Sequence, residues 1–339
     1  MSLNTKQNKK VIFEELGGVD KLKVISTDEN KKPGKGELGI RVKALALNRA
    51  DLLFISGLYG KLDLPTGLGF EASGVVEQIG EEVDGFKVGD SVSVGPNISI
   101  AKYPLSGEYV LVPENSLIKN PDNVSHNDMA ANWVAYFTSY YGLQEAKLTK
   151  GDTVLINAAS SSVSIAAIHL AKYWGARVIA VGRSNKKRSL ALEHGADHYI
   201  STQDEDLVAK VKEYTDGKGV QVIYDSVGGP QFSLFGEIAS IGAKIVVYGA
   251  LDQAPTPIPM YQLIFKSIQI LGFTLGRYLT ADHDEKRLQV TQELNQLFSS
   301  KKYKSLVGKV YKGIDSYIPA VEFLEKADLE GKIIIDLSQ

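Results

Sequence analysis

The size and charge of the chain suit a two-domain protein and exclude several classes of function. Its 339 residues can form two domains, each with a core, and its formal net charge of −2 argues against nucleic-acid binding. The absence of cysteine excludes disulfides, thiolate metal sites and a cysteine nucleophile. No segment has the length of a secretory signal or a membrane span, so we expect a cytoplasmic protein without membrane contact. The first ten residues are expected to precede the folded part.

The first third of the chain is rich in glycine and in short β-branched runs. Ile40–Leu47, Ala72–Ile79, Ser91–Val94 and Tyr109–Val112 are separated by glycine, proline and aspartate. Short strands with frequent turn signals predict an irregular β-rich domain or barrel.

From Gly151 onward, apolar strands alternate with helical spacing, which predicts βαβ units and a parallel sheet covered on both faces. The expected strands are Thr153–Asn157, Arg177–Gly182, Val220–Val227, Lys244–Ala250, Ile268–Thr274 and, at the end of the chain, Ile333–Leu337. The expected helices are Val163–Trp174, Lys186–His194, Asp204–Tyr214, Phe232–Ile241 and His283–Lys301. The fold class is therefore α/β.

The segment between the first of these strands and its helix reads AASSSVSIAAIHLAK and begins at Ala158. In a doubly wound sheet, the pyrophosphate of a dinucleotide meets the free N–H groups of a helix N-terminus at this place. Serines occupy the positions where glycines are usual, so Ser161, Ser162 and Val163 are candidate phosphate contacts. A serine-capped helix of any α/β protein remains the alternative.

The segment after the second strand distinguishes between the two nicotinamide dinucleotides. An NAD-binding domain would carry an Asp or Glu there for the ribose 2′-hydroxyl. Residues 183–188 read RSNKKR instead, with four cations and no carboxylate. This composition suits a 2′-phosphate, so Arg183, Ser184 and Lys187 are candidate ligands of NADP(H). A solvated basic helix start is the alternative.

Several motifs, in this order and spacing, resemble the zinc-independent quinone oxidoreductase branch of the medium-chain dehydrogenase/reductase superfamily. They are ALNRADLLFISGLY (46–59), GFEASGVVEQIG (69–80), GEYVLVP (107–113), WVAYFTSYYGL (133–143), HGAD (194–197), DSVGG (225–229) and EGKIIIDL (330–337). The resemblance implies a GroES-like β-barrel-type catalytic domain, from residues 1–125 and 276–339, and a Rossmann NADP-binding domain, from residues 126–275. It also implies a homodimer or homotetramer.

The resemblance further implies roles for single residues. Asn48 would face the nicotinamide or its ribose, Tyr59 would be a proton donor, and Thr138 would lie near the nicotinamide. A bracing turn for Asn48 and Asp51, and an aromatic pocket wall for Tyr59, remain the alternatives. Further candidate cofactor contacts are Val227, Gly249 and Ala250, at strand ends, and Phe273 and Leu275, in the segment that passes the nicotinamide.

Zinc alcohol dehydrogenases of the superfamily place metal ligands near Asn48, at Phe70 and around Val134. None of these residues is a cysteine or histidine, and the first histidine is His126. Without a Lewis acid, hydride transfer from NADPH to an electron-poor small molecule is easier than alcohol oxidation. We therefore expect reduction of a quinone or of an α,β-unsaturated carbonyl. The alternatives are a 2-enoyl thioester reductase and a crystallin-like NADPH-binding protein with little catalysis.

Overall fold

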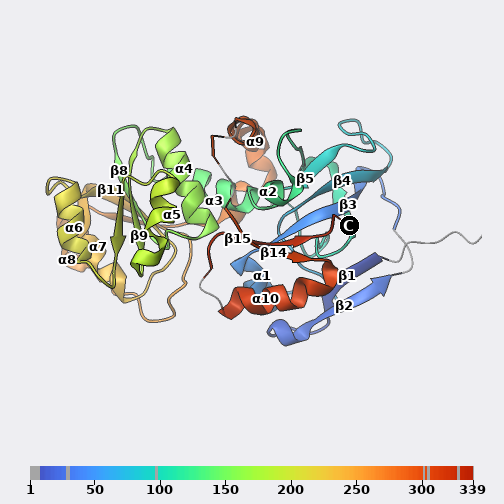
Figure 1. Ribbon diagram of the computed structural model, residues 1–339, viewed down its shortest axis with the longest axis horizontal. Helices are drawn as coiled ribbons and strands as arrows, with labels where there is room; N and C mark the ends of the chain where they lie inside the picture. Colours follow the sequence, from blue (N-terminus) through green and yellow to red (C-terminus); the bar gives the residue numbers. More distant parts are fainter. Residues whose placement is uncertain are drawn as a thin grey trace, which may run out of the picture. The chain divides into compact units, whose positions relative to one another are not determined.

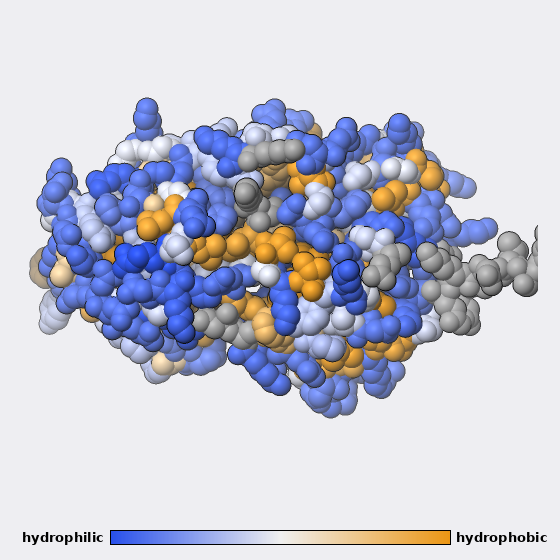
Figure 2. All heavy atoms as spheres, in the orientation of Figure 1, coloured by the Kyte–Doolittle hydropathy of each residue, from blue (hydrophilic) through white to orange (hydrophobic). Residues whose placement is uncertain are grey.

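The computed structural model describes residues 8–27, 31–95, 98–300, 302–303, 306–326 and 329–338. The chain forms two compact units (Figure 1). The first unit comprises residues 1–134 and 279–339, and the second comprises residues 135–278. No helix among the described residues is long and apolar enough to cross a bilayer. Hydrophilic side chains cover most of the face drawn in Figure 2.

The first unit is built around a seven-stranded sheet of order β14-β15-β3-β4-β5-β7, with β6 paired to β3. Its strands are β3 (Glu37–Leu47), β4 (Ala72–Ile79), β5 (Ser91–Val94), β6 (Tyr109–Pro113), β7 (Leu117–Lys119), β14 (Val307–Lys312) and β15 (Lys332–Asp336). Its described helices are α1 (Arg49–Ile55), α2 (His126–Ala130), α9 (Asp284–Ser299) and α10 (Tyr317–Lys326). The antiparallel pairing of β15 with β3 places the end of the chain beside its first third (Figure 1). This pairing explains why the unit is discontinuous in sequence.

The start of the folded part differs from the prediction. Strand β1 begins at Asn8 and pairs antiparallel with β2 (Leu22–Thr27), so residues 8–10 belong to the first unit. The side chain of Arg41 donates a hydrogen bond of 2.5 Å to Asn8 Oδ1, and Thr27 Oγ1 donates to the Asn8 carbonyl. These long-range hydrogen bonds hold the segment in the folded unit, although its polar composition had suggested that it precedes the fold. Residues 1–7 lie outside the described residues.

The division between the units also differs by a few residues from the boundaries expected at 125/126 and 275/276. Helix α2 packs against β3, β4 and β5. Ala130 and Ala131 lie in one apolar cluster with Ala44, Ala46 and Ile334. This packing assigns residues 126–134 to the first unit. Helix α3 (Trp133–Glu145) starts there and continues into the second unit.

The second unit is a six-stranded parallel sheet of order β10-β9-β8-β11-β12-β13. The strands are β8 (Thr153–Ile156), β9 (Arg177–Gly182), β10 (His198–Ser201), β11 (Val220–Asp225), β12 (Ala239–Val247) and β13 (Gln269–Gly272). The helices besides α3 are α4 (Ser162–Tyr173), α5 (Arg188–Glu193), α6 (Leu207–Tyr214), α7 (Phe235–Ile238) and α8 (Met260–Phe265). In chain order, the strands are arranged 3-2-1-4-5-6, the order of a Rossmann dinucleotide-binding domain, with its switch point between β8 and β11.

Several elements of the second unit depart from the sequence-based expectation. Helices α3 and α8 were not predicted, and neither was strand β10, whose four residues begin with a histidine and lack a long apolar run. The helix expected at Phe232–Ile241 ends at Ile238, and β12 begins at Ala239, five residues earlier than Lys244. Ala239 pairs with Val220, and a register shift follows in the ladder between β11 and β12. Pairing with a neighbouring strand therefore overrides the local helical spacing.

Candidate functional site

The turn between β8 and α4 has the geometry of a phosphate-binding turn. Ala158 adopts a φ of 48°, and Ser161 is the N-cap of α4, with its hydroxyl oxygen accepting from the Ser164 N–H at 3.1 Å. The first N–H groups of a helix have no acceptor within the helix, so those of Ser162 and Val163 are suited to an anion. All three predicted contacts thus come together at the positive end of a twelve-residue helix.

Ser164 explains how the turn closes without the usual glycine. Its side chain is fully buried, and its hydroxyl donates a 2.8 Å hydrogen bond to the Asn157 carbonyl at the end of β8. The Tyr248 hydroxyl, just after β12, lies 3.4 Å from the Ser164 hydroxyl oxygen. The helix is therefore fastened to the sheet by hydroxyl groups. A serine at this position is compatible with close packing of helix on strand because its hydroxyl has partners.

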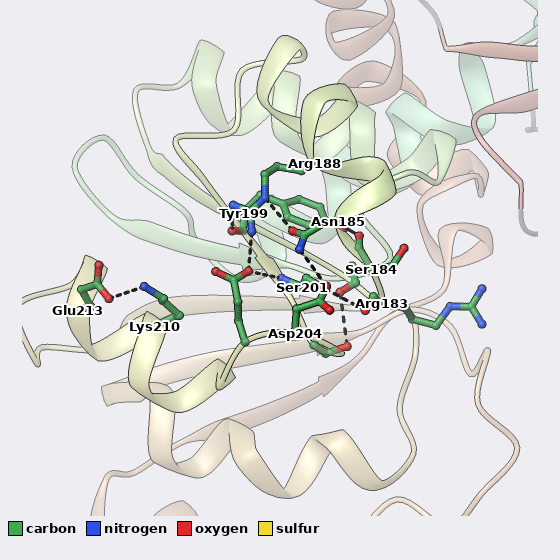
Figure 3. A network of polar contacts seen from close by, with 12 residues as sticks. Arg183, Ser184, Asn185, Arg188, Tyr199, Ser201, Asp204, Lys210 and Glu213 are labelled. Atoms are coloured by element: carbon green, nitrogen blue, oxygen red, sulfur yellow. Dashed lines mark hydrogen bonds and ion pairs between the residues drawn. The ribbon is translucent and has the colours of Figure 1, made fainter.

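The loop after β9 carries the predicted cations, and its two arginines lie in different surroundings (Figure 3). Arg183 is exposed, and its guanidinium extends away from the polar network drawn there. Ser184 and Lys187 are half-buried, and the Ser184 carbonyl accepts a 2.7 Å hydrogen bond from the Tyr199 hydroxyl. Arg188 is instead engaged within the protein, because it pairs with Glu205 at 2.5 Å.

Residues 183–188 contain no carboxylate, but two carboxylates from a neighbouring segment reach this loop. Asp204 and Glu205, from the segment after β10, reach it. Asn185 donates a 2.9 Å hydrogen bond to Asp204 Oδ2, which also accepts from the Ser201 hydroxyl at 2.7 Å. Parallel neighbours in a sheet end at the same edge, and this is why residues about twenty positions apart meet here. Both carboxylates have partners in this network.

The remaining candidates of the second unit lie at the same edge of the sheet. Val227 follows β11, Gly249 and Ala250 follow β12, and Phe273 and Leu275 follow β13, while Thr138 lies on α3. Gly249 is required by packing, because a Cβ there would lie 2.8 Å from the Ser226 carbonyl oxygen. The Thr138 carbonyl accepts from the Tyr224 hydroxyl at 3.0 Å. The sequence therefore predicted a set of residues that the fold gathers at one edge.

In the first unit, Asn48 belongs to a buried polar cluster. Its backbone N–H donates to Asp51 Oδ2 at 2.7 Å, which joins the start of α1 to its first turn. Its side-chain amide donates to Glu71 Oε1 at 3.1 Å, and its Oδ1 accepts from the Lys332 ammonium at 2.6 Å. These contacts match the bracing alternative for Asn48 and Asp51. A contact of Asn48 with a cofactor stays a prediction.

Glu71 and Lys332 were not identified from the sequence. Their ion pair measures 2.8 Å, and the two side chains are 0% and 3% exposed. Glu71 Oε2 also accepts from the Val134 N–H at 2.8 Å, so one carboxylate links three segments of the unit. The only signals in the sequence were a charged residue inside the apolar run GFEASG and a lysine that opens the strand KIIID.

Tyr59 lies on an aromatic surface beside this cluster. Its ring centroid is 6.1 Å from that of Phe54 and 5.6 Å from that of Phe70. Burial raises the pKa of Asp51 to about 7, and burial together with the charge of Asp51 raises the pKa of Tyr59. The Tyr59 side chain is 54% exposed, so it can meet a small molecule while remaining protonated at neutral pH. It is therefore both an aromatic wall and a potential donor.

A buried histidine in the second unit leads to a pH-dependence prediction. His169 Nδ1 lies 2.7 Å from the Tyr136 hydroxyl, and its Nε2 lies 2.8 Å from His194 Nδ1. Burial, and then the proximity of His194, lowers the pKa of His169 to about 3. An unfolded chain binds the proton near pH 6.5, so the stabilising effect of neutral His169 is complete above that pH and is lost as the pH falls toward 3.

Between pH 6.5 and 4 we expect the free energy of unfolding to fall by about 3 kcal/mol through this residue. Urea titrations of the wild type and His169→Phe at several pH values measure the slope. The variant should show a shallower slope, whereas Tyr136→Phe, which keeps the buried imidazole, should retain it. Equal slopes for the wild type and His169→Phe would contradict the assignment.

Comparison with known proteins agrees with both units. The alcohol dehydrogenase GroES-like domain matches residues 34–122, and the zinc-binding dehydrogenase domain matches residues 162–317. A quinone oxidoreductase of Pseudomonas aeruginosa is 33% identical over 84% of this chain and 86% of its own length. The chain belongs to the medium-chain dehydrogenase/reductase superfamily, in its quinone oxidoreductase-like branch. It is therefore an oxidoreductase.

Two solved structures illustrate how the fold is shared within this superfamily. The Escherichia coli quinone oxidoreductase complexed with NADPH superimposes with a TM-score of 0.85 at 28% identity, covering 97% of this chain and 100% of that one. A NAD-dependent alcohol dehydrogenase superimposes equally well, with a TM-score of 0.85 at 29% identity over 97% and 99%. The fold is therefore compatible with either nicotinamide dinucleotide, and the residues of the site must distinguish between them.

The positions that bind zinc in other members of the superfamily do not suit a metal in this chain. The Asn48 oxygen accepts from an ammonium group, Phe70 contributes a ring to the aromatic surface, and the Val134 N–H donates to Glu71. None of these three residues offers zinc a cysteine sulfur, a histidine nitrogen or a carboxylate oxygen. Within the described ranges, no group of three or more His, Cys, Asp or Glu side chains could hold a metal ion.

Proposed function

We propose that this oxidoreductase is a zinc-independent reductase that uses NADPH to reduce quinones or small α,β-unsaturated carbonyl compounds. The observation that carries the cofactor assignment is the loop after β9, where residues 183–188 include Arg183 and Lys187 and no carboxylate, and the nearby Asp204 is hydrogen-bonded to Ser201 and Asn185. A negatively charged 2′-phosphate would gain charge-assisted hydrogen bonds there. The acceptor assignment rests on similarity to quinone oxidoreductases.

In this proposal each part of the chain has a separate task. Bound NADPH supplies a hydride. The N–H groups of Ser162 and Val163 and the hydroxyl of Ser161 hold the pyrophosphate, and Thr138, Val227, Gly249, Ala250, Phe273 and Leu275 border the rest of the dinucleotide. The rings of Tyr59 and Phe70, which pack on the buried Phe54, offer an apolar contact to a flat acceptor. The Tyr59 hydroxyl donates the proton that an alkene acceptor needs at carbon.

A panel of acceptors tests the proposed reaction. NADPH oxidation is followed with benzoquinone, naphthoquinone, a medium-chain 2-enal and crotonyl-CoA. Turnover with a quinone or the enal supports the proposal, and preferential turnover of crotonyl-CoA would identify a 2-enoyl thioester reductase. Tight NADPH binding without turnover of any acceptor would identify a cofactor-binding protein with little catalysis.

Replacing Tyr59 by phenylalanine separates the two classes of acceptor. Reduction of an enal needs a proton at carbon, so Tyr59→Phe should lower its kcat by about a hundredfold. Quinone reduction should change little, because water can protonate the oxygens of a hydroquinone. Phe70→Leu provides a control for the aromatic contact, because Phe70 is partly exposed beside Tyr59, and it should change KM for both acceptors. Unchanged enal reduction in Tyr59→Phe would leave the phenol as a pocket wall.

We also propose that the chain forms a homodimer through β13 and α8. Helix α8 has the sequence MYQLIF and no buried residue, with Tyr261 78% and Phe265 80% exposed. Strand β13 is an edge strand that pairs only with β12 along the described sheet. Edge strands of one sequence can pair antiparallel across a two-fold axis, and the adjacent apolar side chains would then be covered.

Light scattering after gel filtration tests the dimer. We expect twice the chain mass of 36.9 kDa. Phe265→Glu should shift the protein to the monomer mass, because a carboxylate would be buried at the interface. Leu288→Glu, at an exposed position of α9, is the control and should remain dimeric. A monomeric wild type at micromolar concentration would rule this interface out, and a larger assembly would indicate a tetramer.

A further inference from the structure

The loop of residues 182–188 is fixed by an arginine that faces away from the candidate phosphate position. Arg188 Nε donates to Asn185 Oδ1 at 2.9 Å, and one terminal nitrogen donates to the Tyr199 carbonyl at 2.9 Å. Its other terminal nitrogen pairs with Glu205 at 2.5 Å, and its guanidinium lies 5.1 Å from the Tyr199 ring centroid. All three nitrogens are therefore engaged with β10, with the segment after it or with the loop itself (Figure 3).

The neighbouring strand holds the backbone of the same loop at successive residues. The Tyr199 hydroxyl donates to the Ser184 carbonyl at 2.7 Å, and the Gln203 N–H donates to the Arg183 carbonyl at 2.9 Å. The Thr202 N–H donates to the Gly182 carbonyl at 2.9 Å. Gly182 is needed for this arrangement, because a Cβ there would lie 2.0 Å from the Tyr199 hydroxyl oxygen.

These contacts hold the backbone from which the two candidate phosphate ligands extend. With the carbonyls of residues 182–184 tied to the β10 side, the Arg183 side chain leaves the loop on the opposite side from the network (Figure 3). Asn185 is held between Arg188 and Asp204, at the start of the turn that carries Lys187. An arrangement formed before binding lowers the entropy cost of ordering charged side chains around a ligand.

We propose that Arg188 is a positioning residue that holds loop 182–187 in the conformation that binds a 2′-phosphate. The preference for NADPH over NADH then depends on an arginine that does not touch the cofactor. The proposal rests on the NADPH assignment above and adds to it. Without the guanidinium, Asn185 loses a donor and Glu205 loses its counter-ion. The loop then samples other conformations, and the backbone that carries Arg183 and Lys187 is no longer held in place.

Calorimetric dissociation constants for NADPH and NADH test this role. Arg188→Met should weaken NADPH binding by about tenfold and NADH binding much less, since only NADPH carries the extra phosphate. Glu205→Gln and Tyr199→Phe each remove one attachment of the loop and should change the affinity ratio in the same direction. Arg188→Lys should restore only part of it, because an ammonium cannot form the forked contacts. Lys210→Met, which breaks the nearby ion pair with Glu213, is the control and should leave the ratio unchanged.

A double-mutant cycle with Arg183→Ala shows whether Arg188 acts through the loop. If it does, Arg188→Met should have little further effect on the affinity ratio once Arg183 is gone, whereas an independent effect would be additive. A merely structural role would lower the melting temperature and weaken both nucleotides equally. If Arg188→Met does not fold, Glu205→Gln and Tyr199→Phe decide the question.

The two proposals can fail separately. A wild type that binds NADH as tightly as NADPH contradicts the cofactor assignment and this inference with it. A wild type that prefers NADPH, together with an unchanged ratio in Arg188→Met, overturns the positioning role alone.

Discussion

Lys332→Met should lower the free energy of unfolding by about 3–5 kcal/mol, the usual cost of leaving a buried charge without its partner. Glu71 is fully buried, and Lys332 is its ion-pair partner at 2.8 Å. Methionine fills a similar volume but cannot neutralise the carboxylate or donate to Asn48 Oδ1. Because this cluster joins α1, β15 and the start of α3, the loss should affect the whole first unit. Urea unfolding followed by circular dichroism measures the change.

A second substitution shows whether the buried charge is the cause. In Lys332→Met with Glu71→Gln, the neutral amide oxygen can still accept from the Val134 N–H. We expect this double variant to recover a large part of the lost stability. Lys172→Met breaks a half-exposed ion pair with Asp197 in the second unit and should leave the unfolding of the first unit unchanged. If Lys332→Met unfolded at the same urea concentration as the wild type, the ion pair between Lys332 and Glu71 would not stabilise the first unit.

Removing the two candidate cations Arg183 and Lys187 should nearly abolish discrimination between the dinucleotides. Arg183→Ala with Lys187→Ala should weaken NADPH binding by about a hundredfold, because each charge-assisted hydrogen bond to a phosphate contributes about 1.5–3 kcal/mol. NADH lacks the 2′-phosphate, so its dissociation constant should change less than about threefold by the same reasoning. Calorimetric titration with both dinucleotides gives the two values directly.

Two controls accompany this experiment. Lys212→Ala removes an exposed cation from α6, away from the loop, and should alter neither dissociation constant. Raising the salt concentration should reduce the wild-type preference for NADPH, because exposed charge interactions are screened. An equal loss of affinity for NADPH and NADH in the double variant would mean that the cations do not recognise the 2′-phosphate.

The sequence by itself determined the class of the second unit and the location of its candidate site. Short β-branched strands alternating with helical spacing can bury both faces only as a parallel sheet. In such a sheet the turn after β8 and the loop after β9 lie at one edge. Ser161 and Arg183 could therefore be predicted to lie near each other without a structure. The motif resemblance added Asn48 and Tyr59 in the first unit.

The tertiary structure alone decided which charged and polar side chains meet. Lys332 meets Asn48 across a sequence separation of 284 residues. Arg188, in the segment after β9, meets Glu205, in the segment after the neighbouring strand β10. Periodicity reports the environment of neighbouring residues, whereas the partner of a charged side chain depends on strand order and register. Because the two arginines have the same local sequence signal, only the fold could show that Arg188 pairs with Glu205 while the Arg183 side chain extends away from that network (Figure 3).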